Sequence, residues 1–190
     1  ILRHFSFRAI APIAVSSVVS ATLAEYFFPS GILFQNTDSN ISLLPSVTLS
    51  LFLGPVCAII AVIFMKTLLA LQANLNQISQ NEIIRIFYAA AICGVIGGFI
   101  PEVLGLGGST IVGILEDSFA LSFIIIILVV KLFVTVLCLS LGFFGGVFSP
   151  ALVLGAAIGG IFTFFGNQIG FNLLGDSLIL AGMAALSASV

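Results

Sequence analysis

The sequence has 190 residues, of which 61% are hydrophobic and only 6% are charged. Soluble globular domains carry about 25% charged residues, so this composition excludes an ordinary soluble domain and indicates an integral, multi-pass membrane protein. The formal net charge of −2 is too small to indicate a nucleic-acid partner, and strand-like alternation of polar and apolar residues is missing, which argues against a barrel.

Long apolar segments are predicted in the first half of the chain at about residues 7–28, 43–71 and 85–100. The second is long enough to cross a bilayer with tilt. Basic residues flank the first segment and the 72–85 loop, whereas the 29–42 loop has no Lys or Arg. The positive-inside rule therefore predicts a cytoplasmic N-terminus and a cytoplasmic 72–85 loop. Because the chain starts at a residue other than Met and ends within an apolar run, we expect an excised piece of a longer protein.

The cysteines of this chain lie within apolar runs and lack the spacing of metal ligands. With His4 as the single histidine, the sequence predicts no metal site and no cofactor. We interpret Cys57, Cys93 and Cys138 as small buried hydrophobic residues.

The pattern changes after Pro101, where a glycine-rich stretch at 102–110 is followed by a short apolar piece at 111–115. Short apolar pieces interrupted by glycine favour a broken or re-entrant helix, which is common where transporters line a pathway. A nucleotide-binding loop is the competing interpretation. It fails because Thr110 stands where a third glycine would be needed and no Gly-Lys-Ser/Thr follows.

Residues 120–144 form the most apolar segment, and Lys131 lies in its middle. A lysine at the centre of a bilayer costs about 3 kcal/mol on insertion scales, so it should face a partner or water rather than lipid. Two interpretations stay open. Lys131 either raises the positive potential near an anion path or is a structural residue that caps backbone carbonyls.

The stretch Gly145-Gly146-Val147-Phe148-Ser149-Pro150 ends this segment and begins a helix predicted over about 149–165. Ser149 is a favoured N-cap, and Pro150 fits the first helical position. A helix N-terminus has unpaired N–H groups and about half a positive charge, and glycines let an ion approach the backbone. The stretch therefore predicts a site for a small anion.

Small residues follow within the same helix and predict close helix packing; they are Gly155, Ala156, Gly159 and Gly160. A polar turn is predicted at 167–176, and a helix rich in Ala, Gly and Ser at 178–190.

The 145–156 stretch resembles the G-G-x-F-x-P-x-L-x-x-G-A segment of the CLC chloride channels and chloride/proton exchangers. The matching positions are Gly145, Gly146, Phe148, Pro150, Leu152, Gly155 and Ala156. Residues 101–107 and 181–185 are similar to two further segments of that family. The resemblance implies an all-α bundle of tilted and broken helices with inverted-repeat architecture. Residues 1–190 would be part of its single transmembrane domain, namely a bordering helix and most of the second repeat.

The resemblance also implies a function and a site. The protein would be a voltage-gated-type chloride channel or a chloride/proton antiporter. Its anion site would comprise Gly146, Val147 and Phe148, with chloride bound by the backbone N–H groups of Val147 and Phe148 and the Phe148 side chain lining the pathway. Ser149 and Lys131 would line the pathway or act electrostatically. Family members are homodimers, so residues 7–28 are expected near a subunit interface in the cell (inner or plasma) membrane. Chloride, protons and lipid are the expected partners.

Two other classes of protein are alternatives. An unrelated secondary transporter with broken helices is allowed by composition alone. A membrane-embedded enzyme would need a nucleophile–base pair, a metal set or paired intramembrane aspartates, and the sequence contains none of these, so we expect no enzymatic activity. The family's serine segment, gating glutamate, inner tyrosine and internal glutamate are also absent from this chain. The piece alone is therefore not expected to transport.

Overall fold

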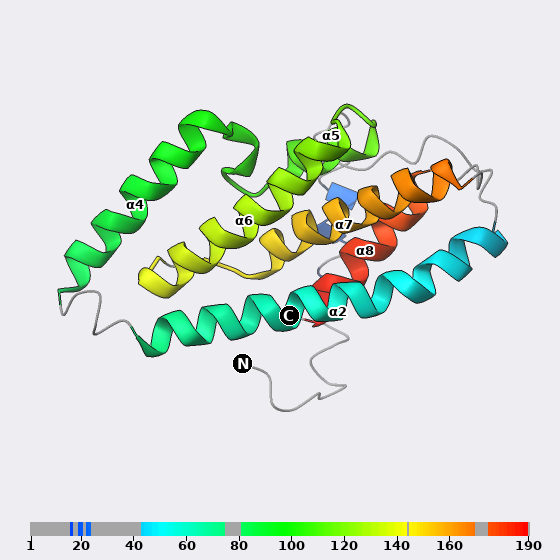
Figure 1. Cartoon of the computed structure of the whole chain (residues 1–190). Helices are drawn as coiled ribbons and strands as arrows, with labels where there is room; N and C mark the ends of the chain where they lie inside the picture. The colour runs from blue at the N-terminus through cyan, green and yellow to red at the C-terminus, as the bar shows by residue number, and fades with distance from the viewer. Residues whose placement is uncertain are drawn as a thin grey trace. The chain divides into compact units, whose positions relative to one another are not determined.

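A computed structural model describes residues 16, 19–20, 22–23, 43–74, 81–143, 145–169 and 175–189 (Figure 1). The chain divides into two compact units, Ile1–Gln35 and Asn36–Val190. In the first unit the described positions are helical. Most of the predicted 7–28 segment, and with it the expected subunit interface, lies outside the described residues. The 29–42 loop also lies outside them.

The described part of the second unit consists of helices joined by turns, with no strand, which confirms the predicted all-α class. Its elements in chain order are α2 (Leu43–Ala73), α4 (Glu82–Phe99), the 3₁₀ helix η1 (Pro101–Val103), α5 (Gly108–Leu115), α6 (Leu121–Leu141), α7 (Phe148–Gln168) and α8 (Gly175–Ser189). Figure 1 labels the α-helices.

Four helices of the described residues are long and apolar enough to cross a membrane. They are α2 over Thr48–Ala73, α4, α6 and α7. Helix α5 has 8 residues and is therefore about 12 Å long, far short of the roughly 30 Å hydrocarbon core. The predicted short helical piece between two spans is confirmed.

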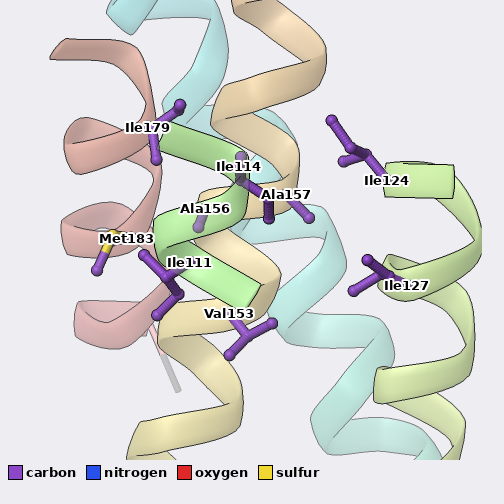
Figure 2. Close-up of a cluster of buried hydrophobic side chains, with 9 residues drawn as sticks. All are labelled: Ile111, Ile114, Ile124, Ile127, Val153, Ala156, Ala157, Ile179 and Met183. Carbon is purple, nitrogen blue, oxygen red and sulfur yellow. The ribbon is translucent and has the colours of Figure 1, made fainter. Parts of the chain in front are cut away.

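Helix α7 lies at the centre of the second unit, packed by α2, α5, α6 and α8. One core cluster joins α5, α6 and α8 to α7 around Val153, Ala156 and Ala157 (Figure 2). A second cluster joins α2 and α6 to α7 around Leu154 and Ile158. Helix α7 is thus held from several sides, which fixes the position of its first turn.

Helices α7 and α8 touch backbone to backbone. A Cβ on Gly155 would overlap the carbonyl of Gly182, and one on Gly159 would overlap the carbonyl of Leu178. Only glycine permits this approach, so the predicted small-residue packing face is confirmed.

The end of α7 differs from the prediction. The helix continues through Asn167 to Gln168, and α8 begins at Gly175, so the polar residues at 167–168 do not form a turn. Polar side chains at the last turn of a helix reach water without breaking its hydrogen bonds. Their polarity marks the last turn of the helix rather than a loop after it.

Candidate functional site

The first turn of α7 provides backbone donors without acceptors inside the helix. Val147 is the N-cap residue, and the first helical bond runs from the N–H of Ala151 to the carbonyl of Val147 over 3.1 Å. The N–H groups of Val147, Phe148 and Ser149 therefore have no acceptor within α7, and Pro150 has no N–H group. Three donors lie together at this helix end.

The glycines before α7 leave space beside these donors. A Cβ added to Gly146 would meet no atom within 4 Å, and one added to Gly145 would meet Leu139 Cδ2 at 3.5 Å. Both glycines are exposed. A small ion can therefore approach the backbone at Gly146 without displacing a side chain.

Ser149 has a different role from the predicted one. Its hydroxyl donates a 2.6 Å hydrogen bond to the carbonyl of Leu106, in the turn before α5. Since Ser149 lies inside the first turn and its hydroxyl is bonded to another segment, the N-cap prediction was wrong, and the N-cap is Val147. Ser149 ties the start of α7 to the broken-helix segment.

Lys131 is buried, with 3% of its surface exposed. Its Nζ donates hydrogen bonds to the carbonyls of Val103 at 2.6 Å and Gly105 at 2.9 Å. The structure therefore shows the carbonyl-capping role that the sequence left as one of two interpretations. An ammonium has three N–H donors, and these bonds use two of them.

The turn between η1 and α5 is held by side chains from three helices. Besides the bonds from Lys131 and Ser149, Thr110 Oγ1 donates to the carbonyl of Glu102 over 2.7 Å. Gly107 has a left-handed backbone with φ of 79°, and a Cβ there would overlap Val153 of α7. Irregular backbone in an apolar layer must have its polar groups satisfied, and these three side chains satisfy four carbonyls of the turn.

A cavity of about 350 Å³ lies between α4, the turn, α6 and the segment before α7. Of the predicted site residues, Lys131 and Gly146 lie on its wall. Val147, Phe148 and Ser149 are not part of the lining. Phe148 is 65% exposed, and Val147 packs against the core cluster shared by α2, α6 and α7. The cavity is thus bordered by Gly145 and Gly146, which precede α7, and by Pro150 of its first turn.

Two side chains that were not predicted as site residues complete a polar stripe on α6. Thr135 and Cys138 follow Lys131 at i+4 and i+7, on one face of the helix, and all three line the cavity. The spacing of these residues on one face of a helix that is mostly apolar was the signal that could have revealed them.

The cysteine prediction holds for one residue and fails for two. Cys57 is fully buried, with its thiol 3.9 Å from the carbonyl of Gly182. Cys93 and Cys138 are partly exposed on the cavity wall, so treating them as buried small hydrophobic residues was wrong. Hydropathy alone does not separate a helix face that meets the core from one that meets a cavity.

Within the residues that the structure describes, no group of three or more His, Cys, Asp or Glu side chains is placed to hold a metal ion.

The whole sequence was compared with models of known protein families. The model described as voltage gated chloride channel matches residues 1–190. The match agrees with the broken helix and the four apolar helices described above. The chain therefore belongs to the voltage-gated chloride channel (CLC) family, an integral membrane family whose members are chloride channels or chloride/proton exchangers.

Proposed function

We propose that this chain forms part of a chloride pathway in which the N-terminus of α7 binds the ion. The observation that carries the proposal is the group of three backbone N–H donors, at Val147, Phe148 and Ser149, beside the open space at Gly146. Fixed N–H donors attract an anion without placing a full positive charge next to it. Binding of this kind is strong enough to replace water and weak enough to allow release.

The residues around these donors have separate roles in this proposal. Gly146 keeps the approach open, and the N–H groups of Val147 and Phe148 bind the ion. The exposed ring of Phe148 forms part of the pathway next to the site. Ser149 and Lys131 act on the site through the turn that they hold, and the Lys131 charge adds to the positive potential of the cavity wall.

The finer assignments rest on the family. We propose a homodimer in the cell (inner or plasma) membrane, with residues 7–28 near the subunit interface and with no cofactor and no enzymatic activity. Protons are a second transported species only if the intact protein is an exchanger. The family match removes the support for an unrelated transporter.

Flux through the intact protein in liposomes tests the function. An outward chloride gradient is imposed, and chloride efflux and internal pH are recorded together. Efflux with proton uptake against its gradient means an exchanger, and efflux without proton movement means a channel. Absence of any anion flux would contradict the proposed function.

The Gly146→Ala variant tests the site. The added methyl group enters open space, so the fold should be kept, but the group stands where the ion approaches the backbone. We expect chloride affinity, measured by isothermal titration, to fall several-fold. Gly98→Ala is the matched control, because a Cβ at Gly98 of α4 also meets no atom within 4 Å. Equal chloride affinity in both variants would argue against the site.

A further inference from the structure

Two thiols meet on the cavity wall. Cys93 lies on α4 and Cys138 on α6, 45 positions apart in the printed sequence, and their thiols interact with each other where the two helices pack and line the same cavity. Neither forms a disulfide, and both are partly exposed to the cavity. Two neighbouring free thiols that reach a cavity can be oxidised to a disulfide, whereas a single buried thiol cannot.

The packing of α4 on α6 brings these thiols together. Ala89 lies one turn before Cys93 on the same face of α4, and it is fully buried against Leu137 and Leu141 of α6. The small side chain of Ala89 lets the two helices approach closely at this level. A disulfide needs its two Cβ atoms about 3.5–4.5 Å apart, a separation compatible with side chains already in contact across a close helix pair.

The surroundings favour reaction at this pair. Both thiols reach the cavity, where a dissolved oxidant can meet them, whereas the fully buried thiol of Cys57 has no such access. The cavity, at about 350 Å³, has room for a small oxidant to reach the sulfur atoms.

We propose that Cys93 and Cys138 are a modification site at which a hydroperoxide, such as hydrogen peroxide, forms a reversible disulfide. One thiol attacks the peroxide oxygen, the O–O bond breaks, and a sulfenic acid and one water are formed. The second thiol then attacks that sulfur and releases the second water. Two thiols are oxidised to one disulfide while one peroxide is reduced to two waters.

The bond joins α4 to α6 directly beside Lys131 and across the wall of the cavity. Because Lys131 holds the turn that is bonded to the start of α7, fixing this wall also restricts the approach to Gly146. This effect on flux rests on the proposed chloride function, whereas formation of the bond does not.

Peptide mass spectrometry of the intact purified protein tests the bond. After treatment with hydrogen peroxide, we expect a linked peptide that contains Cys93 and Cys138 and is lighter by two hydrogens than its two thiol peptides. Dithiothreitol should reverse the change. Cys57 is the control thiol within the same protein. Since it is fully buried, it should appear in no linked peptide and should not react with an alkylating reagent added to the folded protein. Separate oxidation of the two thiols with no linked peptide would overturn the proposal.

Chloride efflux from liposomes tests the consequence. We expect peroxide to reduce efflux several-fold in the wild type and dithiothreitol to restore it, with Cys93→Ser and Cys138→Ser insensitive to both reagents. A linked peptide with unchanged efflux would refute the restriction of the pathway. If the reduced wild type moves no chloride, the proposed function fails, and the peptide result still decides whether the dithiol reacts as proposed.

Discussion

Replacing Lys131 by methionine, which is one atom shorter, removes both the charge and the donors, and comparison with an arginine variant separates the two suggested roles of Lys131. Two bonds from a charged donor are lost, each contributing about 1.5–3 kcal/mol. Removing the buried lysine returns about 2.5–3.5 kcal/mol of its insertion cost. The midpoints, about 4.5 and about 3 kcal/mol, predict a net loss of about 1.5 kcal/mol.

The free energy of unfolding in detergent, followed by circular dichroism, measures this loss. Lys66→Met is the matched control, since Lys66 is exposed on α2 and its replacement should change stability by less than about 0.5 kcal/mol. We also expect reduced chloride efflux for Lys131→Met and for Lys131→Arg, because the larger guanidinium has to fit a site that is 3% exposed. Wild-type stability and efflux in Lys131→Arg, together with lost efflux in Lys131→Met, would refute carbonyl capping as the main role and leave charge instead.

The contacts around α7 give three further predictions. Ser149→Ala should lower the free energy of unfolding by about 1 kcal/mol and weaken chloride binding, because the hydrogen bond to Leu106 is lost. An unchanged chloride affinity in a titration would show that this hydrogen bond does not support the anion site. The double variant with Lys131→Met should deviate from additivity by at least about 0.5 kcal/mol, since both side chains hold one turn; strict additivity would show that they act separately. Gly155→Ala should cost about 1–3 kcal/mol because its methyl group meets the Gly182 backbone, and a thermal midpoint equal to wild type would contradict the contact.

The helices could be predicted from the sequence because each corresponds to a local pattern of apolar, glycine and polar residues. Apolar runs gave the spans, and the short run at 111–115 between glycines and acidic residues gave α5. The glycines of α7 gave its packing face. The end of α7 was misplaced because polar residues are compatible both with a last helical turn and with a loop.

The candidate site was predictable only in part, because its construction depends on contacts between distant segments. The glycine pair and the helix start indicated a place for an anion. The acceptors of Lys131 lie 26 and 28 residues before it, and the acceptor of Ser149 lies 43 residues before it, so no local pattern identifies them. Likewise, an apolar helix sequence does not say that Cys93 and Cys138 face the same cavity.

The close contact of α7 and α8 has a consequence for how the protein is made. The described part of α8, Gly175–Ser189, packs against α7 and α2. Its buried residues Leu178, Ile179 and Leu186 are covered by helices that precede it in the chain. During synthesis, α7 and α2 therefore leave the ribosome first and provide the surface on which α8 enters the membrane. A side chain larger than that of alanine at Gly155 would block that surface before α8 is made, so the defect would be seen as failed biogenesis rather than as altered transport.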